Sequence, residues 1–332
     1  MSVPLSVLDL APIGAGQSAA DALAGTTKLA RRADELGFRR FWVAEHHNIP
    51  SVASTAPEVL IAHIAANTDR IRVGSGGVML PNHAPLAVAE RFAMLEALHP
   101  NRIDLGLGRA PGTDMRTAMA LRSTSPERFE QQFEELRGHL GAGYGGMRAV
   151  AGEHTVPELW VLGSTDGGAR IAAALGLPFV FAHHFHPHFA EPALDLYRSL
   201  FRPSELLDAP RAIVAAGIVV GDDDADAARR ALPGGVAMLR LRQGRPGPIP
   251  SVEDAAALLA RLSPAERAAV DEAIARAIVG DAETVHAALL DLVERTGADE
   301  LMLTSQVADA GQRAQGLERV AWAFELVPQA TV

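Results

Sequence analysis

The chain contains no cysteine among its 332 residues. This absence excludes disulfides, catalytic thiolates and zinc sites built on thiolates. The chain also lacks any apolar run near the ~18 residues that a membrane-spanning helix needs. No basic segment followed by an apolar stretch opens it, so we expect no signal peptide and a cytoplasmic protein.

The chain has fewer basic than acidic residues, 30 against 40, and its formal net charge is −10. A protein of this charge does not favour nucleic acid or anionic membranes, and we expect neither as a partner. A local basic pocket for one phosphate group stays compatible with it. We interpret the run Asp222-Asp223-Asp224 as the start of a helix rather than a metal site, since carboxylates favour a helix N-terminus.

Nearly half of the residues, 48%, are apolar, and short β-rich runs alternate with helical patterns along the chain. A helix from about Ser18 to Leu36 is predicted to end at Gly37, which suits a left-handed cap. Helical sequence follows each predicted strand, and this order predicts an α/β fold, the (β/α)8 TIM barrel. The eight predicted strands are Leu5–Leu8, Phe41–Ala44, Ile71–Ser75, Ile103–Leu107, Leu159–Leu162, Phe179–Ala182, Ile213–Val219 and Leu301–Thr304.

We predict one barrel domain over residues 1–332, with insertions near 109–157 and 233–280. The second insertion contains Gly244–Pro248, whose glycines and prolines predict a mobile loop rather than a helix. Barrel active sites lie at the carboxyl ends of the strands. Both insertions are therefore candidate lids over such a site.

The second predicted strand ends in Glu45-His46-His47. An isolated histidine is more often a structural residue, but three ionisable side chains at a strand end favour a functional role. Because neighbouring residues of a strand face opposite ways, His46 and His47 cannot share one role. We predict that one of them faces the pocket and that the other holds the loop.

The third predicted strand ends in Ser75-Gly76-Gly77. Glycines weaken a strand, so their presence here needs a reason. The backbone either approaches a ligand closely or adopts an unusual peptide geometry, which glycine permits. A simple bulge or turn is an equally good interpretation of this pattern alone.

Arg109 directly follows the fourth predicted strand, where its guanidinium is placed to bind an anion; a surface salt bridge is the alternative. The fifth strand ends in Gly163-Ser164-Thr165, and a helical pattern begins there. Free backbone amides at a helix N-terminus, with two hydroxyls beside them, predict a phosphate site. Ordinary N-capping by Ser164, Thr165 or Asp166 is the competing interpretation.

Four histidines follow the sixth predicted strand, at positions 183, 184, 186 and 188. Such a cluster suggests a metal site. Adjacent histidines in one loop, however, rarely supply tetrahedral geometry unaided. We therefore predict that they shape a polar pocket and that no metal is bound.

These motifs, in this order, resemble those of the luciferase-like monooxygenase family. The resemblance extends from Leu5 to Leu326 and is most specific in the segments Trp42–Asn48, Val73–Pro85 and Asn101–Gly112. Within the family the chain is most similar to the YhbW-like subgroup of flavin-dependent oxidoreductases. The resemblance implies a (β/α)8 barrel that binds a flavin at the carboxyl ends of its strands.

The resemblance also implies roles for the second and third strand ends. His46 matches a catalytic histidine beside the reacting flavin, and we expect it to act as an acid or base with a pKa close to neutrality. Gly76 and Gly77 match a non-prolyl cis peptide that lies against the flavin ring. Ser75, which directly precedes them, is included among the cofactor-binding residues.

Arg109 matches an arginine near the flavin phosphate and ribityl chain, and Gly163 and Ser164, with Thr165 beside them, match the phosphate-binding turn. Two departures from the family concern luciferases proper. Their cysteine near the flavin is absent here, and Gly163 stands where some members carry glutamate. Both departures argue against light emission with long aldehydes and leave flavin binding untouched.

The expected enzyme is thus a flavin-dependent oxidoreductase, a monooxygenase that uses reduced FMN and O2 on a small organic substrate. The resemblance implies that an NAD(P)H:flavin reductase supplies the reduced FMN and that the protein is a homodimer. Two alternatives stay open: an F420-dependent hydride-transfer oxidoreductase and a non-catalytic flavin-binding protein.

Overall fold

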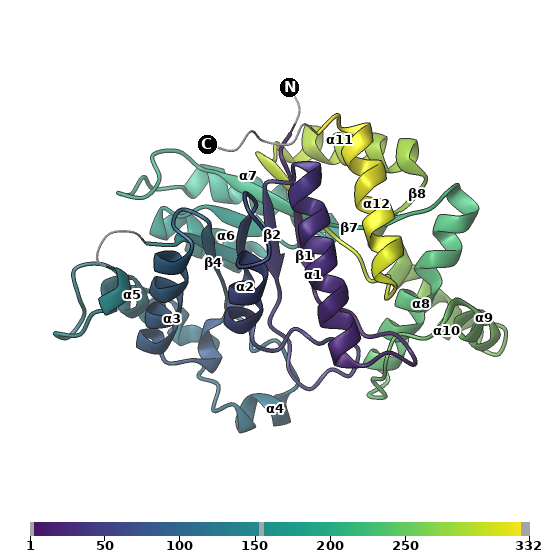
Figure 1. Ribbon diagram of the computed structural model, residues 1–332, viewed down its shortest axis with the longest axis horizontal. Coiled ribbons are helices and arrows are strands. Elements are labelled where there is room, and N and C mark those ends of the chain that lie inside the picture. The colour runs from purple at the N-terminus through teal and green to yellow at the C-terminus, as the bar shows by residue number, and fades with distance from the viewer. Residues whose placement is uncertain (1–2, 153–155, 327–332) are drawn as a thin grey trace.

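The computed structural model describes residues 3–152 and 156–326 and forms one parallel sheet closed on itself (Figure 1). Pairing of β6 with β7 closes the ring, while the short strand β8 (Ala277–Gly280) pairs only with the outer part of β7. The predicted barrel is therefore confirmed. Its eight strands, in chain order, are β1 (Leu5–Asp9), β2 (Arg40–Val43), β3 (Arg72–Met79), β4 (Ile103–Gly108), β5 (Glu158–Gly163), β6 (Phe179–Phe181), β7 (Ala212–Val220) and β9 (Glu300–Thr304).

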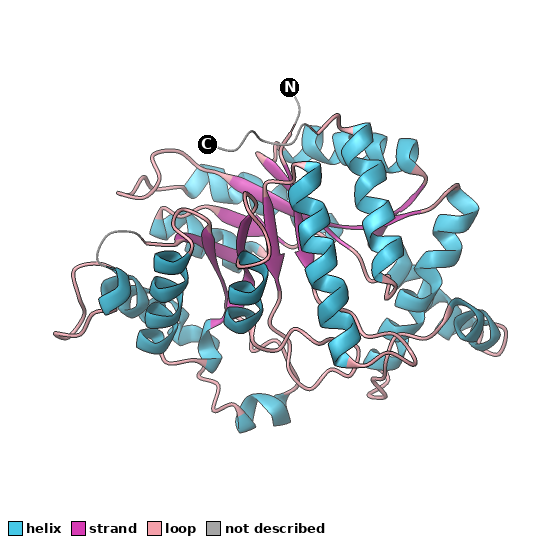
Figure 2. Ribbon diagram, viewed as in Figure 1, coloured by secondary structure: helices cyan, strands magenta, loops and turns pink. Residues whose placement is uncertain are grey.

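Helices surround this barrel (Figure 2), as helix-forming sequence after each strand predicts. Local sequence sets both ends of the first helix, α1 (Ala19–Leu36). Ser18 and Asp21 form a capping box at its start, and Gly37 ends it with a φ of 88°. The helices are α1 (Ala19–Leu36), α2 (Pro57–Ala65), α3 (Pro85–Leu98), α4 (Met115–Ala120), α5 (Phe129–Leu140), α6 (Asp166–Leu175), α7 (Ala190–Leu200), α8 (Asp224–Arg242), α9 (Val252–Leu259), α10 (Pro264–Ile274), α11 (Ala282–Thr296) and α12 (Ala310–Ala323).

The two predicted insertions contain regular structure. Residues 109–157 include α4 and α5 with short 3-10 turns. The segment 233–280 begins inside α8, because Pro233 lies within that helix, and it goes on through α9, α10 and the unpredicted strand β8. Gly244–Pro248 has no helix or strand, as its composition predicts. The predicted helix start is confirmed, since the Asp223 side chain caps α8.

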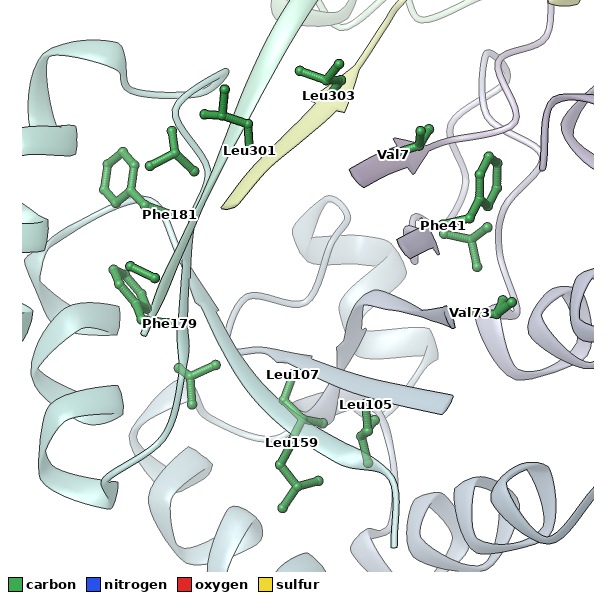
Figure 3. Packing of buried hydrophobic residues seen from close by; sticks show 14 of the residues in the cluster. Val7, Phe41, Val73, Leu105, Leu107, Leu159, Phe179, Phe181, Leu301 and Leu303 are labelled. Atoms are coloured by element: carbon green, nitrogen blue, oxygen red, sulfur yellow. The ribbon is translucent and has the colours of Figure 1, made fainter. Parts of the chain in front are cut away.

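Two apolar layers follow from the alternation of side chains along each strand. Val7, Phe41 and Leu301 belong to the large cluster between strands and helices (Figure 3). Leu8, Trp42 and their equivalents on other strands form a second cluster inside the barrel. The barrel interior is thus a packed core. None of the described helices is long and apolar enough to span a bilayer.

The amino ends of the strands are closed by a buried ion network centred on Arg40, which has no exposed side-chain area. Its guanidinium binds Asp104 at 2.8 Å, Glu158 at 2.9 Å and Glu300 at 3.0 Å. Asp104 also accepts a hydrogen bond from the indole of Trp42 at 2.8 Å. This end of the barrel is fully occupied by side chains, and the site must lie at the other end.

Candidate active site at the carboxyl ends of the strands

A cavity of about 380 Å³ opens at the carboxyl ends of the strands. Its lining is mainly apolar, and α8 supplies one wall through Gly234, Ala237, Met238 and Leu241. Every barrel strand or the loop after it contributes, in chain order through Leu10, His46, Gly76, Arg109, Ser164, His184, Ala215 and Gln306. The cavity therefore has the position and the composition of a small-molecule site.

The end of β3 forms one wall of this cavity. The peptide bond between Gly76 and Gly77 is cis, as the resemblance implied. A Cβ on Gly77 would lie 2.8 Å from the carbonyl oxygen of Gly106, and one on Gly76 would lie 2.6 Å from Leu8 Cδ1. Gly77 therefore requires glycine because the neighbouring backbone cannot shift, whereas the Leu8 side chain could; both glycines line the cavity with backbone alone.

Ser75 directly precedes these glycines in β3. Its side chain is buried and does not line the cavity. Its hydroxyl donates to the carbonyl oxygen of Gly106 at 2.8 Å and accepts from the Gly106 amide at 3.1 Å. The Ser75 side chain thus joins β3 to β4 rather than lining the cavity, and its role in cofactor binding stays a prediction.

The N-terminus of α6 meets Arg109 at the end of β5. Thr165 is the N-cap residue of α6, and no side chain caps this end. A Cβ on Gly167 would lie 2.9 Å from Arg109 Nη2, so the guanidinium lies against the first turn. Ser164, Thr165 and Gly168 line the cavity beside it. The residues predicted to bind an anion therefore lie together here, and the N-capping alternative is not realised.

Charges around this turn leave the guanidinium available. Within residues 3–152 and 156–326, Arg109 has no hydrogen bond or ion pair to a carboxylate. Asp166, which could have repelled an anion, points outward with its carboxylate 3.9 Å from Arg170. The predicted alternative for Arg109, a surface salt bridge, is therefore also not realised.

Glu45 organises the turn that follows β3 and lies with no exposed area. It accepts hydrogen bonds from the Met79 amide at 2.8 Å, from Asn82 at 3.1 Å, from His83 at 3.0 Å and from His47 at 2.8 Å. Burial alone would raise the pKa of this carboxyl, but hydrogen bonds from His83, His47 and Met79 lower it below its usual value. His47 is thus the histidine that holds the loop.

His46 is the histidine that faces the cavity. Burial first, and the nearby His184 second, lower its pKa to about 4. The expectation of a pKa close to neutrality is therefore wrong, because desolvation outweighs the attraction of Glu45. At neutral pH the imidazole carries no charge, and its Nδ1 is buried with no hydrogen-bond partner among the described residues.

The four histidines after β6 separate in space. His184 lines the cavity, and its Nδ1 donates to the carbonyl oxygen of Ala215 at 2.9 Å. His183 is buried nearby with its pKa lowered to about 4, chiefly by burial, while His186 and His188 are exposed. Among the described residues, no three His, Asp or Glu side chains gather as metal ligands would.

Sequence patterns missed two parts of the cavity. The wall from α8 could not be located, because an amphipathic helix does not reveal which strand ends it faces. The hydrogen bonds that join the loops at the mouth are also tertiary: Ala15 donates to Ile249 at 2.7 Å, and Ile13 donates to Ser51 at 2.8 Å. Pro246 and Gly247 of the predicted mobile loop line the cavity next to these contacts.

Fold and site together define a (β/α)8 barrel whose carboxyl end holds a cavity lined by Arg109, the N-terminus of α6 and the glycines of β3. The model of the luciferase-like monooxygenase family matches residues 3–300. The chain belongs to this family, as the sequence motifs implied.

Similar proteins agree with that assignment. An uncharacterized protein of Bacillus subtilis, YvbT, is 47% identical over 96% of this chain and 95% of its own length. A luciferase-like monooxygenase of Escherichia coli is 42% identical over 96% of both chains. The crystal structure of apo-MsnO8 is 38% identical and superposes with a TM-score of 0.90, covering 98% of this chain and all of that one.

More distant structures share the barrel alone. One is the oxygenating constituent of 3,6-diketocamphane monooxygenase from Pseudomonas putida in complex with FMN, with a TM-score of 0.68 and 18% identity over 97% of each chain. Another is an F420-dependent secondary alcohol dehydrogenase, with a TM-score of 0.64 and 16% identity over 99% of each chain. The fold therefore accommodates either cofactor.

Proposed function

We propose that the protein is an FMN-dependent monooxygenase that uses reduced FMN and O2 to oxygenate a small organic substrate. One observation carries the proposal: the unpaired Arg109 and the uncapped N-terminus of α6 share one cavity with the bare backbone of Gly76 and Gly77. The first pair suits a phosphate and the second suits a flat ring. FMN carries both groups in one molecule.

In this proposal the phosphate accepts hydrogen bonds from the first amides of α6 and from Ser164 and Thr165, while Arg109 neutralises its charge. Gly76 and Gly77 let the ring approach the backbone. Bound reduced FMN supplies the electrons for oxygen activation. The apolar lining keeps water away from the reacting atoms.

His46 acts in this site as a neutral imidazole. A neutral ring has one donor nitrogen and one acceptor nitrogen, so it can pass a proton without holding a positive charge. Its low pKa means that protonation is unfavourable until a negative charge is placed beside it. His46 therefore controls proton transfer at the edge of the bound cofactor.

The charge of the residues that line the cavity favours FMN over F420 as the cofactor. F420 bears carboxylates besides its phosphodiester, and each buried carboxylate needs a cationic partner. Among the described residues that line the cavity, Arg109 is the one with a permanent positive charge. A single phosphate is matched by this arrangement, and additional carboxylates are not.

The test is a pair of binding titrations followed by an oxygen measurement. We expect FMN to bind tightly and F420 weakly, and we expect oxygen uptake when an NAD(P)H:flavin reductase supplies reduced FMN in the presence of substrate candidates. Preferential oxidation of reduced F420 would replace the proposal with hydride transfer. FMN binding with no substrate-dependent oxygen uptake across a broad substrate panel would replace it with flavin storage.

We also propose that the protein is a homodimer joined through α2 and α3. Val59 on α2 and Met94 and Leu98 on α3 are 71%, 58% and 64% exposed, which is unusual for such side chains on neighbouring helices. Light scattering of the wild type and of Met94→Glu tests this. A dimer mass for both proteins would exclude this face as the interface.

A further inference from the structure

The ring of strands divides the cavity into two halves. The end of β3 and the anion site at β4 and β5 occupy one half, where the proposed FMN would bind. The strands β6, β7, β9 and β1 form the other half, and in this ring β6 lies directly opposite β2. His184 at the end of β6 therefore lines the cavity opposite β2, and it is close enough to His46 to lower the pKa of that residue.

The second half of the cavity is lined almost entirely by apolar groups. Its lining includes Leu10, Val180, Phe185, Ala215, Met238 and Met302. The polar side chains that join them are His184 and Gln306. No carboxylate and no cation lines this half within the described residues. A buried charged group there would be desolvated without a partner, which costs several kcal/mol or more.

The hydrogen-bonding character of His184 is set by one carbonyl group. The oxygen of Ala215 accepts from the backbone amide of His184 at 3.1 Å and also contacts its Nδ1 at 2.9 Å. A carbonyl oxygen only accepts, so Nδ1 carries the proton. Burial lowers the pKa of His184, so the ring is neutral and Nε2 presents a lone pair. No described residue donates to this Nε2.

We propose that the second half of the cavity binds an uncharged, mainly apolar substrate that carries a hydroxyl, and that His184 Nε2 accepts the hydrogen bond of this hydroxyl. This inference rests on the proposed function for the location of FMN in the first half. His184 acts as a substrate-positioning residue. The remaining contacts are apolar, so the hydroxyl orients a substrate that the lining would otherwise hold without preference.

The test is calorimetric titration of the full chain, saturated with oxidised FMN, with three probes of matched shape. These probes are para-butylphenol, para-butylanisole and para-butylbenzoate. The phenol should bind about 3- to 10-fold more tightly than the anisole, the effect of one neutral hydrogen bond. The benzoate should bind at least about 10-fold more weakly than the phenol, because its charge meets no cation. Benzoate binding as tight as that of the phenol, or no phenol binding at its solubility limit, would overturn the proposal.

Variants in the same loop separate positioning from structure. His184→Phe keeps a ring but removes the acceptor, so the preference for phenol over anisole should disappear while anisole binding is retained. The exposed His186→Phe is the matched control and should keep the preference. A phenol preference that survives in His184→Phe would assign the acceptor to another group and refute the inference.

A second series makes failure of this inference distinguishable from failure of the proposed function. FMN titration of the wild type alone tests the cofactor. The three probes are then titrated into FMN-free Arg109→Ala, in which the anion site has lost its cation and competes less for benzoate. The same order of affinities in this variant supports the substrate class whatever the cofactor. The reverse order overturns it even where FMN binds.

Discussion

The two ends of the barrel treat buried charge in opposite ways. At the amino end, Arg40 is completely buried and is bound by the carboxylates of Asp104, Glu158 and Glu300. At the carboxyl end, Arg109 borders the cavity with no carboxylate partner among the described residues, and the imidazole of His46 is kept neutral by burial.

This difference separates stability from function within one architecture. A buried charge needs a partner, and at the amino end three carboxylates of the protein itself bind the guanidinium of Arg40. At the carboxyl end the missing partner leaves a place for a ligand of opposite charge. The same strands thus carry a closed, self-compensated end and an open end that a ligand completes.

The largest expected effect comes from removing Arg40 at the closed amino end of the barrel. Arg40→Met should lower the free energy of unfolding by about 3–5 kcal/mol, because three carboxylates lose their shared cation. Arg137→Met removes a half-exposed surface arginine and should change stability by less than about 1 kcal/mol. The midpoint of urea denaturation measures both. Equal effects would mean that the network at the amino end does not stabilise the fold.

At the open end, His46→Ala should lower the rate of substrate-dependent oxygen uptake about 100-fold, the usual effect of losing an acid or base. FMN affinity should stay nearly constant, since the phosphate site is untouched. Steady-state rates and FMN fluorescence titration are measured on the same preparations. A rate unchanged by the substitution would remove His46 from the chemistry.

The pH dependence of stability also tests the contrast between the two ends, because it detects that the fold keeps the buried His46 uncharged. The pKa of His46 is lowered to about 4 by burial first and by His184 second, from an ordinary value of 6.5. Protonation then favours the unfolded chain, so this contribution is fully present above pH 6.5 and is lost as the pH falls toward 4.

Between neutral pH and pH ~5, the free energy of unfolding of the wild type should therefore fall by about 2 kcal/mol more than that of His46→Gln. The glutamine side chain of this variant does not titrate. Urea denaturation at both pH values measures this difference. The exposed His186→Gln should behave as the wild type does. Parallel losses in all three proteins would show that His46 is not buried as a neutral group.

The smallest expected effect concerns Arg109. Arg109→Ala should weaken FMN binding about 10-fold, which corresponds to ~1.4 kcal/mol, because the amides of α6 and two hydroxyls remain. Stability should not fall, since no carboxylate is left unpaired. Arg116→Ala, on the exposed surface of α4, is the control. A large loss of stability would show that Arg109, like Arg40, stabilises the fold.

Local sequence determined the barrel and most of its strand ends. Alternating strand and helix patterns, the capping glycine at 37, the glycine pair at 76 and 77 and the small residues at 163–165 all act through the backbone within a few residues. Their structural consequences were predicted correctly for that reason. Strand alternation alone also predicted that His46 and His47 have different roles.

Only the tertiary structure decided which groups meet. Ser75 faces Gly106 instead of the cavity, and His184 is the one member of its cluster that enters it. The pKa of His46 falls because distant strands bury it, and Arg40 is stabilised by carboxylates from three other strands. These outcomes depend on contacts between residues far apart in the chain. Burial and charge pairing are properties of such contacts, so no local pattern contains them.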